Sequence, residues 1–429
     1  MTNTLRRSSL SIARLAMLLV AVATPAFGAG EQHPFPQHVT YAPGTIRPSH
    51  QTVTQQDDAV RAYYDQWKAD YLTTDNTTDP SHWRVRFGKT APNRDITVSE
   101  GQGFGMVIVA LMAGHDPQAQ EIFDGLWGFV QANPSNIDPR LMGFKVPPDV
   151  PGVTDSAFDG DCDIAYGLLL ADAQWGSAGD VDYAADAAVL ITAIRESTIG
   201  PVSRLPMLGD WTDPAGKRFN QYTPRSSDFI LDHFRAFERA TGDSVWADVV
   251  DVSQDVIESL QDRYTRNRRL GVNTGLLPDF IKVTPTTFAA KPARGGFLEG
   301  RFDGRYYYNA VRDPWRLGTD ALLNDDARSL VATRLIAVWS NLAAEGDPAN
   351  IKGGYRLNGK PLPGSDYFSI VFAAPFGVAA MTDPAQQDWL NAIYDAVSTT
   401  HEEYYEDSVT LLSLLVMTGN YWDPTTIGP

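Results

Sequence analysis

The stretch DDAVRAYYDQWKADYL, residues 57–72, repeats apolar side chains every three to four positions behind an acidic start. This spacing gathers the apolar residues on one face of a helix, and the acidic start suits the positive end of the helix dipole. Ten later segments show a similar period: 105–113, 117–131, 164–175, 184–196, 228–240, 245–264, 327–344, 369–381, 386–398 and 409–417. Strand-like alternation is rare, so the sequence predicts an all-α fold.

Connectors rich in Gly, Pro, Asn and Asp separate these segments, and some are long and aromatic. No proline-rich linker or break in composition divides residues 29–429, which favours one helical domain. Nested helical hairpins closed into a barrel would satisfy this pattern and collect the long connectors at one end. An open helical solenoid fits the periodicity as well.

The N-terminal residues 1–28 are typical of a secretory signal peptide. Positive charges at Arg6, Arg7 and Arg14 precede a short apolar core over residues 15–22, and small residues at Ala26 and Gly28 suit signal-peptidase cleavage. The core is too short for a membrane span. The arginine pair also permits twin-arginine export, and the alternative is an ordinary amphipathic helix. A secreted or periplasmic protein without membrane attachment is expected.

The overall composition excludes several classes of function. With 35 Lys and Arg against 52 Asp and Glu, the net charge of −17 argues against a nucleic-acid partner. The single cysteine, Cys162, excludes a disulfide within the chain and a cysteine-based metal site. Seven scattered histidines form no zinc-protease motif, and we predict neither a metal nor another cofactor.

The segment VSEGQGFGM, residues 98–106, places Glu100 in a glycine-rich turn ahead of an apolar helix. Glycines at alternate positions allow another chain or a substrate to approach the backbone closely. Partial desolvation beside Phe104 would raise the pKa of Glu100 and keep it protonated as a general acid. The alternative is that Ser99 caps the helix and Glu100 complements its dipole.

Three aspartates, Asp159, Asp161 and Asp163, alternate in SAFDGDCD, residues 156–163. The EF-hand pattern fails, because its glycine and glutamate positions hold Ile164 and Leu170. An irregular calcium site is an alternative interpretation. Otherwise we expect Asp163 to cap the next helix, and Asp159 or Asp161 to point toward a site where sugar hydroxyls relieve their repulsion.

Carboxylates interleaved with aromatic residues recur in the connectors, a pattern that suits carbohydrate. Aromatic faces stack on sugar rings, while Arg and carboxylates bind the hydroxyls; core packing is the alternative use of each aromatic residue. The segments concerned are 208–211, 223–228, 273–280, 296–300, 306–316 and 403–408.

Together these segments resemble glycoside hydrolase family 8, secreted bacterial glycanases built as an (α/α)6 barrel, over essentially the whole mature chain. The family's acid segment matches Ser99–Met106, which implies that Glu100 is the general acid. Its second signature implies that Asp159 holds the sugar at the cleavage position. The matching residues are Ala157, Asp159, Gly160, Asp161, Ile164, Ala165 and Trp175, whereas Phe158 stands where the family carries a hydroxyl residue.

The catalytic base differs between branches of this family. One branch uses an Asp in a Tyr-x-Tyr-Asp segment, where this chain has Asn309, and an amide cannot accept a proton from water. A second branch, similar to chitosanases and chitosanase-glucanases of bacilli, carries Asn there and a base Glu in an upstream loop. The loop Phe297–Gly300 is similar, which implies that Glu299 is the base.

The resemblance implies an endo-acting, inverting hydrolase that cleaves β-1,4 linkages in chitosan or β-glucan, and a monomer is expected. Xylan-active hydrolysis, a polysaccharide lyase and a non-catalytic sugar-binding protein are the alternatives. The predicted catalytic residues are Glu100, Glu299 and Asp159. The predicted substrate-binding residues are Trp211, Tyr404, Tyr405, Asn309, Arg312, Asp161, Phe104 and Arg225.

Overall fold

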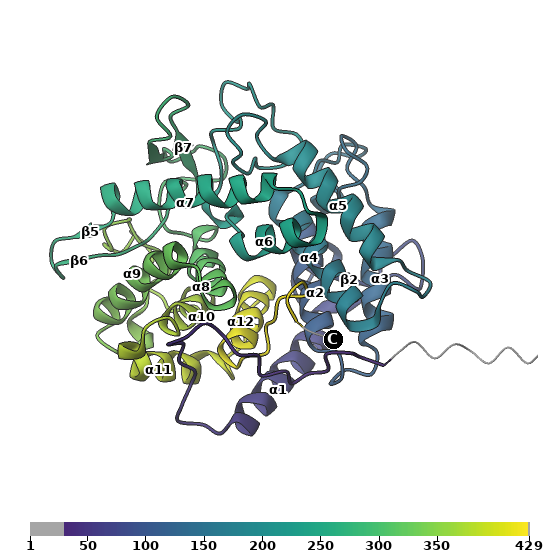
Figure 1. The fold of residues 1–429 in the computed structure, drawn as a ribbon, viewed down its shortest axis with the longest axis horizontal. Coiled ribbons are helices and arrows are strands. Elements are labelled where there is room, and N and C mark those ends of the chain that lie inside the picture. The colour runs from purple at the N-terminus through teal and green to yellow at the C-terminus, as the bar shows by residue number, and fades with distance from the viewer. Residues whose placement is uncertain (1–29, 428–429) are drawn as a thin grey trace, which may run out of the picture.

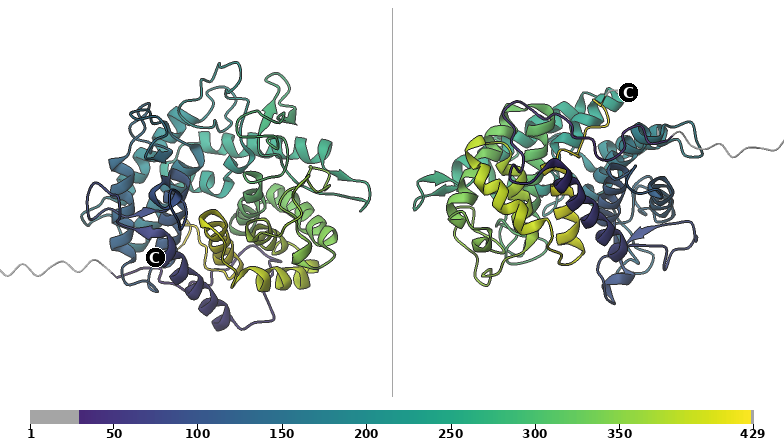
Figure 2. Two further views of the ribbon diagram at one scale, coloured as in Figure 1. Left: turned by 180° about the vertical axis from the view of Figure 1, so that it is seen from behind. Right: turned by 90° about the horizontal axis from the view of Figure 1, so that it is seen from below.

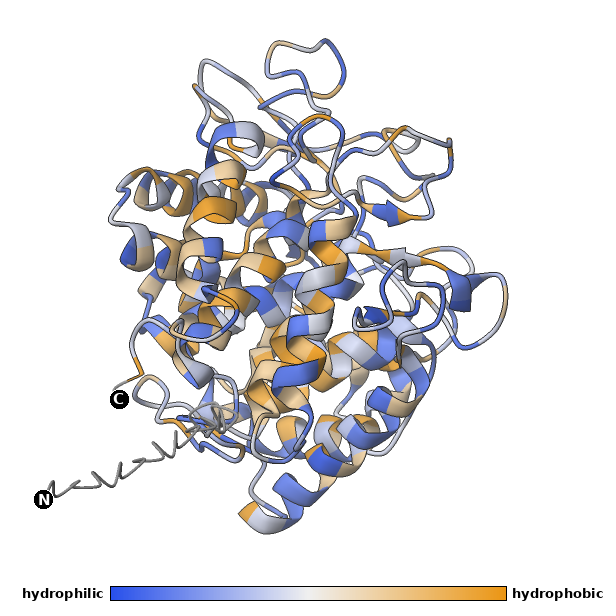
Figure 3. Cartoon of the chain, turned by 90° about the vertical axis from the view of Figure 1, so that its right-hand side faces the viewer, coloured by the Kyte–Doolittle hydropathy of each residue, from blue (hydrophilic) through white to orange (hydrophobic). Residues whose placement is uncertain are grey.

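The computed structural model describes residues 30–427, and five of its helices bury nearly all of their side chains. These are α2 (Ser99–Leu111), α4 (Phe158–Trp175), α8 (Asp313–Asn324), α10 (Ile370–Ala380) and α12 (Tyr404–Met417). A helix that is buried on every side must be surrounded by other elements. These helices therefore form the centre of the molecule, where most of the hydrophobic residues gather (Figure 3).

The inner helices form a closed ring once α6 (Leu231–Thr241) is added. Each contacts the next in the order α2, α4, α6, α8, α10 and α12, and α12 returns to contact α2. Figure 1 views this ring end-on and Figure 2 shows it from behind and from below. The closing contact confirms the predicted (α/α)6 barrel and excludes an open solenoid.

Each inner helix packs against one outer helix, which completes six hairpin-like pairs. The outer helices are amphipathic, and burying one face while exposing the other places them around the ring (Figure 1). They are α1 (Val53–Tyr71), α3 (Ala119–Ala132), α5 (Tyr183–Thr198), α7 (Val245–Tyr264), α9 (Ala327–Ala344) and α11 (Gln387–Val397).

Strands are confined to four short antiparallel ribbons in the connectors. The ribbons are β1 (Leu72–Thr73) with β2 (Arg84–Val85), β3 (Thr97–Val98) with β4 (Lys145–Val146), β5 (Arg266–Asn267) with β6 (Val272–Asn273), and β7 (Ile281–Val283) with β8 (Ala290–Pro292). Five 3₁₀ turns complete the elements: η1 (Asn93–Asp95), η2 (Ser226–Asp228), η3 (Ala310–Arg312), η4 (Pro348–Asn350) and η5 (Pro384–Gln386). Strand β3 leads directly into α2.

All eleven predicted helical segments are helices, and the sequence analysis missed α8. Helix α8 begins at Asp313-Pro314, and proline is well tolerated in a first turn, where its missing N–H costs no hydrogen bond. Its buried polar residues Arg316 and Asp320 interrupt the apolar period that marked the other helices.

Helices α2, α4 and α12 begin earlier than predicted. Glu100, Asp159 and Tyr404 consequently lie in the first turns of helices rather than in connectors. The prediction that Asp163 caps a helix is wrong, because α4 already begins at Phe158 and Asp163 lies inside it. Likewise, Ser99 is the first residue of α2, and no side chain caps that helix.

Close packing between α2 and α4 explains the glycines at both helix starts. A Cβ at Gly160 would lie 2.4 Å from Ser99 Oγ and 2.6 Å from the Ser99 carbonyl carbon. A Cβ at Gly103 would lie 2.7 Å from the Asp163 Cβ. These distances are below van der Waals contact, so the glycines bring together the two helix ends that carry Glu100 and Asp159.

The predicted signal sequence, residues 1–28, lies outside the described residues. Across residues 30–427, no helix is long and apolar enough to cross a membrane.

We expect Gly160→Ala to destabilise the protein by about 1–3 kcal/mol, the usual cost of forcing an extra methyl group into a packed contact. Chemical denaturation measures this change. The matched control is Gly179→Ala, an exposed position where a Cβ meets nothing within 4 Å. Equal stability of the two variants would contradict the helix-contact role of Gly160.

Candidate active site

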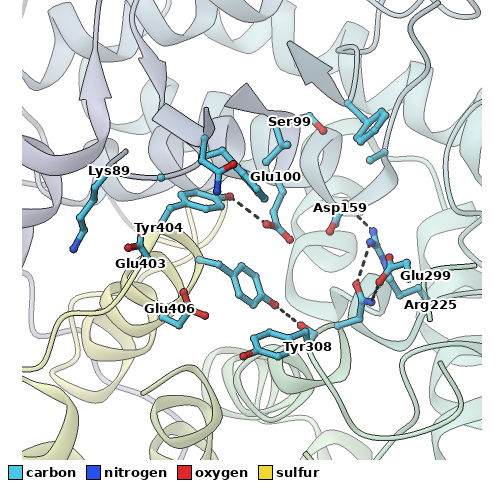
Figure 4. A pocket seen from close by; sticks show the side chains of 18 of the residues that line it. Lys89, Ser99, Glu100, Asp159, Arg225, Glu299, Tyr308, Glu403, Tyr404 and Glu406 are labelled. Carbon is cyan, nitrogen blue, oxygen red and sulfur yellow. Dashed lines mark hydrogen bonds and ion pairs between the residues drawn. The ribbon is translucent and has the colours of Figure 1, made fainter. Parts of the chain in front are cut away.

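A cleft of about 600 Å³ lies where the first turns of α2, α4 and α12 meet the long connectors (Figure 4). Its walls combine carboxylates, cations and aromatic rings. The lining residues are Phe87, Gly88, Lys89, Thr90, Asn93, Val98, Ser99, Glu100, Phe144, Ala157, Asp159, Arg225, Glu299, Tyr308, Asn309, Glu403, Tyr404, Tyr405 and Glu406. The three predicted catalytic residues, Glu100, Asp159 and Glu299, are all among them.

The Glu100 side chain is held by two donors at the start of α2. Its Oε2 accepts a hydrogen bond from Arg312 Nη1 at 2.7 Å, and its Oε1 accepts one from the Tyr404 hydroxyl at 3.1 Å. Burial raises the pKa of Glu100, and the nearby Asp159 carboxylate adds to this, although Arg312 opposes it. Glu100 therefore keeps its proton to higher pH than a free carboxyl group.

The neighbouring Asp159 is buried between two guanidinium groups. Its Oδ2 lies 2.6 Å from Arg312 Nη1. Its Oδ1 lies 2.8 Å from Arg225 Nη2, a contact that Figure 4 shows. Burial alone would raise the pKa of Asp159, but Arg225 and Arg312 outweigh burial and hold it well below the usual range. Asp159 is therefore ionised where Glu100 is protonated.

Glu299 reaches the cleft from a loop that Asp303 organises. The Asp303 carboxylate accepts the backbone N–H groups of Leu298, Glu299 and Gly300 at 2.7, 3.3 and 2.7 Å. Beside them, the buried Phe297 packs edge-on against Phe219, at 5.1 Å between ring centroids. The loop thus holds Glu299 at an exposed position where water can reach its carboxylate.

Asn309 links Glu299 to the two arginines that contact Asp159. Its Nδ2 donates to Glu299 Oε2 at 2.7 Å, while its Oδ1 accepts from Arg225 Nη1 at 3.3 Å and Arg312 Nη2 at 3.5 Å. A continuous chain of polar contacts therefore runs from Glu100 through Arg312 and Asn309 to Glu299. Asn309 orients Glu299 and binds no proton itself.

Two further buried carboxyl groups, Asp279 and Asp228, support this arrangement. The sequence analysis gave Asp279 no role and expected Asp228 to start a helix, but Asp228 lies in η2, ahead of α6. Asp279 Oδ1 accepts the N–H groups of Tyr307 and Ala310 at 3.0 and 2.8 Å and fixes the turn that carries Asn309. Burial raises the pKa of Asp279 to about 8, and the charge of Glu299 adds to the shift.

Asp228 supports Arg225, whose Nε donates to its Oδ1 at 2.9 Å. Burial raises the pKa of Asp228 to about 7, although Arg225 opposes this shift. Asp279 and Asp228 both lie in polar connectors noted in the sequence analysis. Their burial could not be predicted there, because it depends on the folded chain.

Four of the predicted substrate contacts do not line the cleft: Arg312, which lies behind it, and Phe104, Asp161 and Trp211. Phe104 is fully buried against Trp315, with ring centroids 6.0 Å apart, because it faces the ring of inner helices. Asp161 is fully buried and accepts the N–H of Met142 at 3.0 Å. Trp211 packs edge-on against Phe219 at 5.3 Å, in a small apolar cluster beside the Glu299 loop.

The other predicted contacts do gather at the site. Arg225, Asn309, Tyr404 and Tyr405 line the cleft, and Arg312 lies directly behind Glu100 and Asp159. Tyr404 is only 1% exposed, so it presents its hydroxyl to Glu100 rather than a broad ring face to a ligand.

Cleft residues that the sequence analysis did not single out include two exposed phenylalanines. Phe87 is 38% exposed and Phe144 is 40% exposed, so part of each ring is open to the cleft. No sequence pattern distinguished them from core phenylalanines. In contrast, Tyr308, Glu403 and Glu406 lay in segments already noted for interleaved acids and aromatics.

The irregular calcium site is not supported, because the three alternating aspartates face different partners. Asp159 pairs with arginines, Asp161 accepts a backbone N–H, and Asp163 pairs with His233 and Arg316 at 2.9 and 2.6 Å. Within residues 30–427, no group of three or more His, Cys, Asp or Glu side chains is arranged to hold a metal ion.

Comparisons with known proteins find relatives over most of the chain. The model of glycosyl hydrolases family 8 matches residues 46–419. A beta-glucanase of Niallia circulans is 43% identical over 412 residues, 95% of each protein, and an endoglucanase of Bacillus sp. (strain KSM-330) is 38% identical over 92% of this chain and 83% of its own.

Two solved structures have a similar fold. The apo structure of a β-1,3-1,4-glucanase from Paenibacillus sp. X4 superposes with a TM-score of 0.85 at 41% identity, covering 92% of this chain and all of that one. A cold-adapted family 8 xylanase superposes with a TM-score of 0.69 at 17% identity, a likeness in fold.

We expect Tyr404→Phe to raise the pKa of Glu100 further, because the lost hydroxyl stabilises the ionised carboxylate. The expected shift is upward, because a hydrogen bond to a charged group is stronger than one to a neutral group. Difference infrared titration, with Glu100→Gln as the blank, measures it.

The control for this titration is Tyr183→Phe, which removes a hydroxyl that donates to Asp124 instead. It should leave the Glu100 titration unchanged. An unchanged or lowered pKa in Tyr404→Phe would show that this hydroxyl does not act on Glu100.

Proposed function

Because this chain belongs to family 8 of the glycosyl hydrolases, we propose that it is a secreted, endo-acting β-glucanase that inverts the anomeric centre. The observation that carries the proposal is that Glu100, whose pKa is raised by burial, and the solvent-exposed Glu299 line one cleft. An open cleft with aromatic faces at Phe87 and Phe144 suits an extended glycan.

In the proposed mechanism, Glu100 donates its proton to the glycosidic oxygen while Glu299 removes a proton from water on the opposite face of the sugar. The water oxygen bonds to the anomeric carbon as the carbon–oxygen bond to the leaving sugar breaks. Inverting pairs are usually about 6.5–9.5 Å apart, which leaves room for that water. Each group contributes roughly 10²- to 10⁴-fold to the rate.

Asp159 has a different part in this mechanism. Because Arg225 and Arg312 keep it ionised, it accepts hydrogen bonds from sugar hydroxyls and favours the positive charge that develops on the ring. The same negative charge raises the pKa of Glu100, so one residue both binds the sugar and keeps the acid protonated.

The β-glucan assignment draws on relatives named beta-glucanase, endoglucanase and β-1,3-1,4-glucanase at about 40% identity. Chitosan is the second candidate, because a chain of net charge −17 attracts a cationic polymer. The cleft is lined by five acidic residues and two cations, Lys89 and Arg225, so its charge does not exclude chitosan and the choice of β-glucan rests on the relatives. Export through the segment at residues 1–28 and a monomeric state complete the proposal.

We expect Glu100→Gln and Glu299→Gln each to lower kcat on mixed-linkage β-glucan about 10²- to 10⁴-fold with unchanged folding. The matched control is Glu406→Gln, another carboxylate of the same cleft without a contact to either residue, which should stay within tenfold of wild type. Reducing-sugar release on β-glucan, carboxymethyl cellulose, chitosan and xylan measures the rates. Near-wild-type rates for either catalytic variant would contradict the assignment, and ultraviolet-absorbing unsaturated ends would instead indicate a lyase.

We further expect Asn309→Asp to restore part of the activity, about tenfold or more, to the Glu299→Ala variant. The amide of Asn309 lies 2.7 Å from the Glu299 carboxylate, and Arg225 and Arg312 beside it would keep a new aspartate ionised. The comparison is Asn309→Ser in the same Glu299→Ala background. Equal rates for the two double variants would show that a carboxylate at position 309 does not reach the water.

A further inference from the structure

Positive charge is concentrated in one part of this acidic chain. Residues 263–305 contain nine Lys and Arg but only three Asp and Glu, whereas the whole chain has a net charge of −17. Two of the three acids, Asp279 and Asp303, are buried. The cations are Arg263, Arg266, Arg268, Arg269, Lys282, Lys291, Arg294, Arg301 and Arg305.

Five of these cations, with Arg218, line two adjoining surface hollows. The first, of about 660 Å³, is lined by Arg218, Lys282, Lys291 and Arg294 together with Phe297. The second, of about 460 Å³, shares Lys291 and Arg294 and adds Arg301, Arg305 and Tyr264. We call the two together the basic hollow.

The cations of the basic hollow are not neutralised by the protein. Within residues 30–427, none of these six side chains has a carboxylate oxygen within 4.0 Å, although Arg140, Arg195 and Arg328 elsewhere each pair with two carboxylates. Instead, Lys282 lies over the ring of Phe297 at 5.0 Å and Arg301 over that of Phe302 at 4.4 Å. Gathered like charges repel one another, and an anionic ligand relieves that repulsion.

The basic hollow adjoins the loop that carries Glu299. Arg218 donates to the carbonyl oxygens of Gly296 and Phe297, and Phe297 lines the hollow. Glu299, two residues further on, lines the cleft. The same short loop therefore contributes to both surfaces.

We propose that the basic hollow binds an anionic polysaccharide of the polyuronate type, at a site separate from the cleft. Carboxylates repeated along such a chain match the cations around both hollows. Tyr264, which is 38% exposed, adds a ring face for a sugar. A nucleic acid fits less well, because its dense phosphate charge meets the acidic remainder of the protein beyond the hollow.

This site does not depend on hydrolysis in the cleft. It would hold the protein on a mixed matrix in which neutral glucan lies beside acidic glycan. Because the attraction is between exposed charges, it should weaken steeply as salt is added.

The test measures binding of the full-length mature protein to polygalacturonate by calorimetry at low salt. The Lys291→Gln, Arg294→Gln double variant removes the two cations shared by both hollows and should bind about tenfold more weakly or worse. In 0.5 M NaCl the difference should disappear. The control is the double variant Arg61→Gln, Arg195→Gln. It removes the same number of positive charges, at arginines that already pair with carboxylates, and should bind polygalacturonate like wild type.

Equal polygalacturonate binding by the double variant and wild type would overturn the proposal. Tighter binding of single-stranded DNA than of polygalacturonate, at equal concentrations of charge, would overturn the choice of carbohydrate. Hydrolysis of neutral β-glucan, assayed in parallel, should be unchanged in both variants. If the wild-type protein does not hydrolyse β-glucan, the proposed function is wrong, but the proposed polygalacturonate site is not affected, because binding is measured independently of hydrolysis.

Discussion

The buried guanidinium of Arg312 is the interaction on which the cleft depends. It is 1% exposed and contacts Glu100, Asp159 and Asn309, which come from separate parts of the chain. A buried charge is strongly destabilising unless it is paired and hydrogen-bonded, so the inner helices must bring these partners together for the fold to form. The closed ring and the close approach of α2 and α4 meet that condition.

The same constraint divides the roles of the carboxyl groups. Two cations, Arg225 and Arg312, face several acids in a space with little water, and not all of those acids can be ionised. Asp159 pairs with both cations, which lower its pKa. Burial and the charge of Asp159 raise the pKa of Glu100. Glu299 lies on an exposed loop that Asp303 holds, and the amide of Asn309 orients its carboxyl group. An acid and a base therefore arise from one residue type through differences in environment.

Much of this could be predicted from the sequence, because helical periodicity and the motifs around Glu100, Asp159 and Glu299 are local patterns. What was missed depends on tertiary packing. The helices that carry the site begin earlier than their apolar period suggests, since their first turns contain Gly or acidic residues. Whether an aromatic residue packs in the core, as Phe104 does, or opens onto the cleft, as Phe144 does, is decided by distant segments. The supporting role of Asp279 likewise needs the folded chain.

The central claim is that the protonated Glu100 and the base Glu299 act on opposite faces of one β-glycosidic bond. Proton NMR of the products during early hydrolysis of a β-glucan tests this most directly, because single displacement by water inverts the anomeric centre. The account predicts that the α-anomer of the new reducing end appears first and then equilibrates toward the β-anomer. Initial release of the β-anomer would contradict it.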